Sequence, residues 1–236
     1  MALYCYRKSI PKVRRQWPFV SSVLIIFGFV LLANVFLPIF LYQLKRSNLH
    51  QPIISPLSDS TIVLGAGFMG ADYTKPTNWF PSAPKLAPFQ SKITHYNLSI
   101  PKLEIEKAVV HIGGEDLTRA LIHYSGTALP GQFGKAVVFG HSVLPQFFNP
   151  QNYKTIFSTL PELEKNDEIL VEFDGIVYRY QVVEMVEVSP QDISVLSQQY
   201  DAEYLTLITC VPPGTYLKRL VVKARLVPYY NGDSKY

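Results

Sequence analysis

LTLITC, at residues 205–210, is an apolar run that reads as a strand and ends on a cysteine. A Pro-Pro-Gly break at residues 212–214 follows it, and Arg219 comes soon after. The chain has two cysteines, and the other one, Cys5, precedes a long hydrophobic segment. If that segment crosses a membrane once, Cys210 lies on the far side without a disulfide partner in the chain. A solitary thiol in that position indicates a reactive cysteine.

The sequence on both sides of this run is β-rich from about residue 96 to residue 228. Strands are expected at residues 98–100, 108–112, 136–140, 169–173, 176–188, 204–210 and 220–227. Asp174-Gly175 separates two alternating runs, and this pair supplies the positive φ angles of a tight hairpin turn. So many closely spaced strands favour one barrel or sandwich, and roughly 130 residues is an ordinary size for one domain.

Two short helical segments are expected between the strands. Residues 116–124 predict a short helix with Asp116 as its N-cap and apolar residues on one face. Residues 190–197 predict a helical turn. The fold class is therefore mainly β with short helices.

Residues 19–42 form an uncharged segment rich in Phe, Leu, Ile and Val. At about 1.5 Å per residue, such a helix exceeds a hydrocarbon core of roughly 30 Å and is predicted to span a membrane. More basic residues precede the segment than follow it, which predicts a cytoplasmic N-terminus and places the rest of the chain outside the cell membrane. A cleaved signal peptide is the alternative, but the apolar core is long for one, and residues 43–46 lack a small-x-small cleavage pattern. We therefore predict an uncleaved, single-pass anchor.

The other regions differ in composition. The predicted order is a basic cytoplasmic N-terminus (1–18), the transmembrane anchor (19–42), an extracytoplasmic linker or stalk (43–94), the β domain (95–228) and a polar C-terminal tail (229–236). The linker is rich in Pro, Ser, Gly and Asn, but residues 61–64 and Trp79-Phe80 are apolar enough to dock on the domain that follows. The formal net charge of +4 comes largely from the N-terminal cluster. Without a basic stripe in the exported part, nucleic acid is not an expected partner.

A nucleophilic cysteine needs a base or a cationic neighbour, because the thiolate is the reactive form. His141 is the leading candidate, since it follows the strand-like run 136–140, whose final glycine permits close approach of a substrate. Taken alone, a histidine at a strand end is still more often structural than catalytic. The other histidines have simpler explanations as solvated residues of the stalk, the domain start, an alternating strand and the end of the predicted helix: His50, His95, His111 and His123.

Arg219 can be placed by strand alternation. It shares one face of its run with Val221, Lys223 and Arg225, while the residues between them form an apolar face. Arg219 is thus predicted to lie off the core. An ordinary solvent-facing arginine is the default reading, and its position just after the Cys210 break makes a role in the same site the alternative.

These motifs together resemble those of the sortase family: TLITC at residues 206–210, an arginine nine positions after the cysteine, and Gly140-His141 upstream. The resemblance extends from SIPKL at 99–103 through TALPGQFGK at 127–135 to Val221-Val222, which is essentially the whole β domain. An N-terminal anchor followed by an exported domain also fits this family.

The resemblance implies a closed eight-stranded β-barrel and a cysteine transpeptidase that cleaves an LPXTG-like C-terminal sorting signal on exported proteins. It implies that Cys210 attacks the scissile carbonyl and that His141 is the general acid and base. Arg219 would stabilise the oxyanion or hold the substrate backbone. The acyl group would pass to an amine of a cell-wall precursor or a pilin lysine. No metal or other cofactor is expected; some sortases bind calcium, but no acidic cluster here identifies such a site.

The chain departs from many sortases at Ser142 and Lys135, where arginine and asparagine are common. Pilin-polymerising sortases often carry an Asp-Pro-aromatic lid, which Asn78-Trp79-Phe80 echoes faintly, and a second, C-terminal membrane helix, whereas this chain ends in polar residues 231–234. These differences favour a single-anchor enzyme of protein sorting or wall attachment, with a pilin-polymerising sortase as the alternative.

Other functions remain open. A membrane-tethered barrel that only binds exported peptides would not require cysteine, histidine and arginine together. A hydrolase that resolves the thioacyl intermediate with water has the same residues as a transpeptidase, so sequence does not separate the two. A papain-like protease fits less well, because its cysteine precedes its histidine, whereas His141 precedes Cys210 here.

Overall fold

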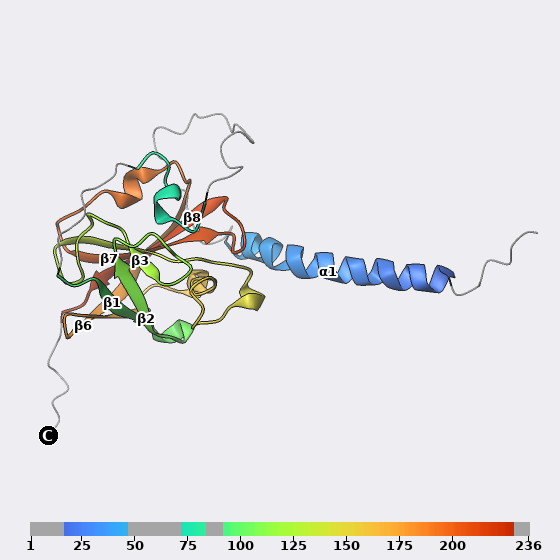
Figure 1. The fold of residues 1–236 in the computed structure, drawn as a ribbon, viewed down its shortest axis with the longest axis horizontal. Coiled ribbons are helices and arrows are strands. Elements are labelled where there is room, and N and C mark those ends of the chain that lie inside the picture. Colours follow the sequence, from blue (N-terminus) through green and yellow to red (C-terminus); the bar gives the residue numbers. More distant parts are fainter. Residues whose placement is uncertain (1–16, 47–71, 84–91, 229–236) are drawn as a thin grey trace, which may run out of the picture. The chain divides into compact units, whose positions relative to one another are not determined.

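The computed structural model of the chain describes residues 17–46, 72–83 and 92–228. Most of the predicted cytoplasmic N-terminus, the apolar stretch 61–64, His50 and the polar tail lie outside the described residues. Within them, the chain consists of one long helix and one β-barrel (Figure 1).

Helix α1 (Trp17–Arg46) is long and apolar enough to be a candidate membrane span, over Phe19–Leu44. Its mean hydropathy there is 2.7, and its large apolar side chains are exposed. Asn34, a polar residue within it, donates its side-chain amide to the carbonyl of Val30 at 2.9 Å. A helix with no polar face and with exposed apolar side chains is suited to lipid rather than water.

The barrel has eight strands that close in the order β1-β2-β3-β4-β7-β8-β6-β5. The pairs β2/β3 and β4/β7 are parallel, and all other neighbouring pairs are antiparallel. Closure leaves no free sheet edge. The strands are β1 (His95–Ile100), β2 (Ile105–Ile112), β3 (Leu121–His123), β4 (Gly134–Phe139), β5 (Glu168–Phe173), β6 (Ile176–Val188), β7 (Glu203–Val211) and β8 (Lys218–Leu226).

Short 3-10 turns lie outside the strands, and no α-helix occurs among residues 72–83 and 92–228. The turns are η1 (Pro76–Asn78), η2 (Pro101–Leu103), η3 (Pro145–Phe147), η4 (Leu160–Glu162) and η5 (Ile193–Leu196). The helical turn predicted at 190–197 is confirmed by η5. The hairpin prediction is also confirmed, because β5 and β6 pair up to Phe173 and Ile176, and Asp174 and Gly175 have φ values of 53° and 73°.

The short helix predicted over residues 116–124 is wrong. Residues 117–120 form turns, and Leu121–His123 form β3, which is paired with β2 on one side and β4 on the other. All three residues of β3 are buried, so they show neither a helical nor an alternating pattern. Tertiary pairing, which is not visible in the local sequence, decided their conformation.

The two faces of the sheet carry two separate apolar clusters. Leu205, Leu207 and Val211 of β7 join a cluster with members from all eight strands, which only the barrel interior can collect. Ile208 and Cys210 join a second cluster, on the outer face of β4, β7 and β8. Alternation along β7 therefore places Cys210 outside the barrel core but under another layer of the chain.

Candidate active site

Cys210 and Arg219 lie directly opposite each other where β7 pairs with β8. Strand β4 runs parallel to β7 on its other side, with Phe139 beside Ile208 and the amide of Gly140 donating to the Ile208 carbonyl at 3.1 Å. His141 follows Gly140 directly. The three residues singled out from the sequence are thus brought to one end of three neighbouring strands.

Two side-chain hydrogen bonds join the ends of β4 and β7. Thr209 donates its hydroxyl to the Gly140 carbonyl at 2.8 Å, and Ser142 donates its hydroxyl to the Cys210 carbonyl at 2.7 Å. A side chain at Gly140 would collide with Phe157, so only glycine fits this position. These contacts fix the backbone on which His141 and Cys210 stand.

Arg219 is fully buried, at 0% exposure, so the reading as a solvent-facing arginine is wrong. Its guanidinium donates to the backbone carbonyls of Tyr216 (3.1 Å), Lys218 (3.2 Å) and Trp79 (3.1 Å). It also lies 5.5 Å from the centre of the Trp79 ring, within the range of a cation–π contact. The Nε atom of Arg219 has no hydrogen-bond partner among the described residues. These three hydrogen bonds use three of the five N–H donors of the guanidinium, so the buried Arg219 cation still has donors available.

Residues 72–83, here called the cover segment, lie over this end of the outer face. Trp79 is 0% exposed, and it packs edge-on against Phe139 and within 5.9 Å of the His141 ring. Phe80 is also buried and packs against Phe139. Trp79 and Phe80 therefore dock on the barrel, as their apolar character suggests. The side chain of Arg219 lies beneath them.

The cover segment is held by polar and aromatic contacts at its start. The Leu117 amide donates to the Thr74 carbonyl at 3.0 Å, and the Trp79 indole donates to the Tyr73 carbonyl at 2.8 Å. The Tyr73 ring stacks on Tyr216 at 4.3 Å. The segment is thus joined both to the β2–β3 connection and to the β7–β8 loop.

Burial governs the protonation of the two titratable groups. It raises the pKa of Cys210 to about 11, and the nearby Arg219 charge opposes this shift. It lowers the pKa of His141, while the carboxylates of Asp116 and Asp72 act in the opposite direction. Beneath the cover segment, the thiol and the imidazole are therefore neutral at pH 7. The site thus contains a thiol and an imidazole, which are the groups of a cysteine nucleophile and its base, and both are in their neutral forms.

The other described histidines lie elsewhere. His95 and His111 face each other across β1 and β2 and are exposed. His123 is 1% exposed and bonds to the Tyr96 hydroxyl at 2.9 Å and the Thr127 hydroxyl at 3.1 Å, so the expectation that it is solvated is wrong. Among the described residues, no three His, Cys, Asp or Glu side chains gather as metal ligands would.

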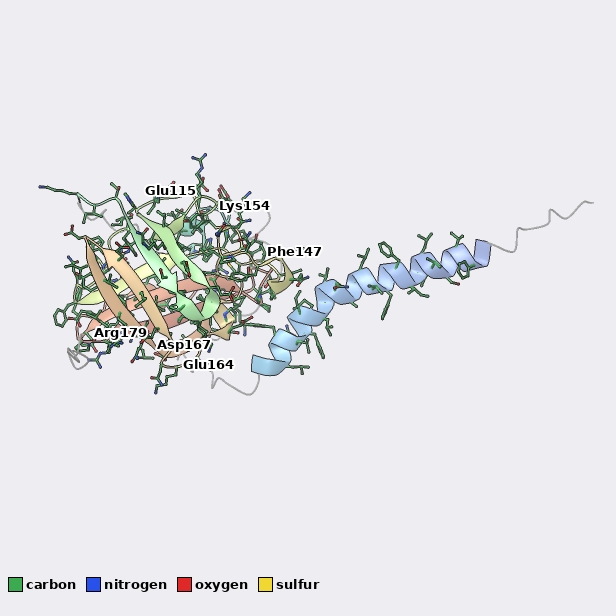
Figure 2. The ribbon with its side chains drawn as sticks, turned by 90° about the horizontal axis from the view of Figure 1, so that it is seen from below. Glu115, Phe147, Lys154, Glu164, Asp167 and Arg179 are labelled. Atoms are coloured by element: carbon green, nitrogen blue, oxygen red, sulfur yellow. The ribbon has the colours of Figure 1, made fainter. Side chains whose placement is uncertain are left out.

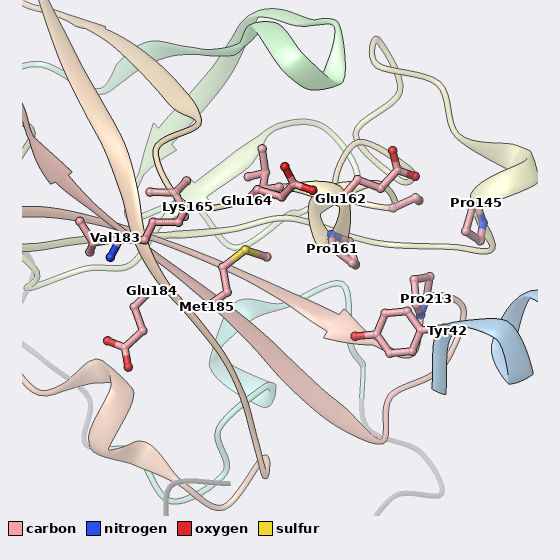
Figure 3. Close-up of a pocket in the computed structure, with 13 residues that line it drawn as sticks. Tyr42, Pro145, Pro161, Glu162, Glu164, Lys165, Val183, Glu184, Met185 and Pro213 are labelled. Atoms are coloured by element: carbon pink, nitrogen blue, oxygen red, sulfur yellow. The ribbon is translucent and has the colours of Figure 1, made fainter. Parts of the chain in front are cut away.

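A pocket opens on another part of the barrel (Figure 3). Its walls are β6 around Val183 and Met185 and the connection before β5 around Pro161, with carboxylates of Glu162 and Glu184 at its margin. Neither Cys210, His141 nor Arg219 lines it. The pocket is therefore separate from the three candidate residues at the strand ends.

Comparison with known proteins shows which family the chain resembles. The chain matches the sortase domain family over residues 98–227. It is 28% identical over 134 residues to sortase D of Bacillus subtilis (strain 168), a match that covers 55% of this chain and 62% of that protein, less than two thirds of its length.

Solved sortases share the fold. Sortase C-1 of Actinomyces oris has a TM-score of 0.52 at 27% identity, with 62% of this chain and 89% of that chain covered. The lid mutant of Corynebacterium diphtheriae sortase A has a TM-score of 0.52 at 28% identity, with 61% and 76% covered. The pilus-related sortase C of Group B Streptococcus gives 0.52 at 27% identity, with 63% and 76% covered. The closed eight-stranded barrel implied by the sequence resemblance is confirmed, and since the family match covers more than half of the sequence, this chain belongs to the sortase family.

Proposed function

We propose that this sortase is a cysteine transpeptidase that cleaves an LPXTG-like sorting signal on exported proteins and transfers the acyl group to an amine. The observation that carries the proposal is the placement of Cys210 opposite Arg219, with His141 at the end of the adjacent strand. A nucleophile, an acid and base, and an anion-stabilising donor are what acyl transfer through a thioester requires.

In the first half-reaction, the Cys210 thiol gives its proton to His141, and the resulting thiolate attacks the scissile carbonyl carbon to form a C–S bond. The oxygen becomes an oxyanion, which accepts hydrogen bonds from the Arg219 guanidinium. Collapse of this intermediate breaks the C–N bond, and His141 gives its proton to the leaving amine.

In the second half-reaction, the acceptor amine attacks the thioacyl carbonyl and gives a proton to His141. Arg219 again stabilises the oxyanion. The C–S bond then breaks and a new amide leaves the enzyme, and the Cys210 thiolate takes the proton back from His141. Each proton and electron pair is returned, so no cofactor is consumed.

The cover segment must move for this cycle to run. Cys210 is 2% exposed, and one Arg219 donor is occupied by the Trp79 carbonyl. In the reaction, a substrate oxygen would need that donor. The described state is therefore a resting one.

A second candidate is a pilin-polymerising sortase, in which the acceptor amine is a pilin lysine. The cover segment favours it, because a lid before the barrel is a feature of such enzymes, as does the similarity to a pilus-related sortase C. The two candidates differ in the acceptor and not in the chemistry of Cys210.

We also propose that α1 anchors the protein in the cell membrane with its N-terminus in the cytoplasm. The apolar character of α1 and the basic residues before it support this orientation. The barrel would then meet exported proteins as they leave the membrane.

The test uses the full chain in detergent, with LPXTG-like donor peptides and two kinds of amine, triglycine and a lysine-containing peptide. Mass spectrometry of the products should show a donor–acceptor amide, and the preferred amine separates wall attachment from pilin polymerisation. A product that contains only hydrolysed donor would mean a hydrolase. Equal turnover by the Cys210→Ala variant would overturn the proposed chemistry altogether.

A further inference from the structure

Strands β4 and β7 stop pairing through their backbones just before the candidate active site. The Gly140 amide, one residue after the end of β4, donates to the Ile208 carbonyl at 3.1 Å. Hydrogen bonds in a parallel pair are evenly spaced, so the next bond of this ladder would join the Ser142 amide to the Cys210 carbonyl. Residues 141–144 lie outside the strand, because the chain turns away from β7 there.

The Ser142 side chain makes the bond that its backbone would make in a longer strand. Its hydroxyl donates to the Cys210 carbonyl at 2.7 Å. Beside it, the Thr209 hydroxyl donates to the Gly140 carbonyl at 2.8 Å. Two side-chain hydroxyls thus continue the pairing of the two segments after β4 has ended. His141 lies between the two residues that they join on the β4 side.

The His141 segment is also held from its other side. The Phe157 amide donates to the His141 carbonyl at 3.0 Å, and the Val143 amide donates to the Ser158 hydroxyl at 2.9 Å. Phe157 and Ser158 are buried residues of the β4–β5 connection, whereas Phe147 of the same connection is exposed at the surface (Figure 2). These two bonds fix the segment to the connection and not to β7.

We propose that Ser142 is a positioning residue for the proposed reaction, whose hydroxyl fixes the Cys210 backbone beside the residue that follows His141. The proposal rests on the proposed function, in which a proton passes between the Cys210 sulfur and the His141 ring. That transfer requires the two side chains to meet at hydrogen-bond distance, so a shift of about 1 Å in either backbone is costly.

Loss of the Ser142 hydroxyl would affect the rate more than the fold. The segment would keep its two bonds to the β4–β5 connection, so it would stay on the barrel. The ends of β4 and β7 would be less firmly joined, and fewer molecules would hold the thiol and the imidazole in line. An interaction that serves only the transition state lowers kcat and kcat/KM equally when it is removed.

The experiment measures kcat and KM for transfer of an LPXTG-like peptide to triglycine by the full chain in detergent, together with the melting temperature. Ser142→Ala should lower kcat about tenfold and leave KM near the parent value, because the groups are misplaced and the substrate site is intact. Ser142→Thr keeps a hydroxyl at this position and should recover most of the rate.

Ser158→Ala is the matched control, because it removes a neighbouring hydroxyl that holds the same segment without a bond to Cys210. Ser158 is 1% exposed, and its loss takes away the acceptor of the Val143 amide. This variant should lower the melting temperature more than Ser142→Ala does and leave kcat close to that of the parent. The two variants therefore separate positioning from stability.

A parent-like kcat in Ser142→Ala would overturn the inference. So would an equal fall of kcat in Ser158→Ala, which would mean that any loosening of the segment slows the enzyme, or a raised KM with an unchanged kcat. Cys210→Ala separates this failure from that of the proposed function. If Cys210→Ala turns over normally, both fall; if it is inactive while Ser142→Ala matches the parent, only the inference falls.

Discussion

Arg219 shows at the level of a single residue how the strand pairing creates a site. It is buried on the outer face of β8, opposite Cys210, and its guanidinium donates three hydrogen bonds to backbone carbonyls, while Nε has no partner among the described residues. Alternation along the strand predicts which face it occupies, but not that another segment buries it. That information lies in the cover segment, far away in the sequence.

We predict that Arg219→Ala lowers kcat/KM by ~10²–10³, the usual loss for a donor that stabilises an oxyanion. Arg219→Lys should recover little of this loss, because an ammonium lacks the planar fork of donors. Steady-state kinetics on the full chain would measure both effects, with a melting curve to show that each variant is folded. A folded Arg219→Ala protein with parent-like kinetics would remove Arg219 from the mechanism.

His123 is the residue that the sequence places least well. It sits in β3 between Tyr96 and Thr127, and burial lowers its pKa from 6.5 to about 4. Between pH 6.5 and about pH 4, this histidine is protonated in the unfolded chain but neutral in the folded chain. Stability is therefore complete above pH 6.5 and falls as the pH drops towards 4.

The predicted loss between pH 6.5 and pH 4 is about 3 kcal/mol from this group alone. Chemical denaturation of the barrel at a series of pH values measures it. A His123→Gln variant should lose much of this pH dependence, while His111→Gln, at an exposed position of β2, should keep it. An identical pH dependence in the parent and His123→Gln would contradict the assignment.

The cover segment buries the residues that are proposed to react. Trp79 and Phe80 fill the outer face beside Phe139, and Trp79 also contacts His141 and Arg219. Because burial is what raises the pKa of Cys210, displacement of these rings should both expose the sulfur and favour the thiolate.

We expect Trp79→Ala to increase the rate of Cys210 alkylation by iodoacetamide at pH 7, by at least several-fold. Phe133→Ala is a suitable control, since Phe133 is an exposed ring just before β4, at the opposite end of that strand from His141. Peptide mapping distinguishes Cys210 from Cys5. Unchanged alkylation of Cys210 in Trp79→Ala would mean that the segment does not limit access.

The strands differ in whether the residues within them are enough to predict them. The alternation of residues 176–188 and the Asp-Gly turn predict β6 and its hairpin, because period-two patterns and positive φ angles are local properties. The local sequence does not predict strand β3, because three consecutive buried residues show no period. Its two neighbours, β2 and β4, are what make it a strand.

At the scale of the whole molecule, composition and periodicity leave a barrel and a sandwich equally open. The order of strands in the closed barrel depends on the crossover connections that make β2/β3 and β4/β7 parallel. The sequence of one strand does not reveal which strands it pairs with. The barrel is predicted by the motif resemblance to sortases. The strand register then shows that these motifs lie side by side. The parallel β4/β7 pair brings Gly140-His141 beside the end of TLITC, although 69 positions separate His141 from Cys210.

The most direct test of this account is the intact mass of the full chain after incubation with LPXTG-like peptides, beside the Cys210→Ala variant. We predict an added mass equal to the acyl part of one peptide on the parent alone, and its loss when an amine acceptor is added. The same adduct on Cys210→Ala, or a parent that cleaves the peptides without ever carrying the acyl group, would contradict a thioacyl-enzyme on Cys210.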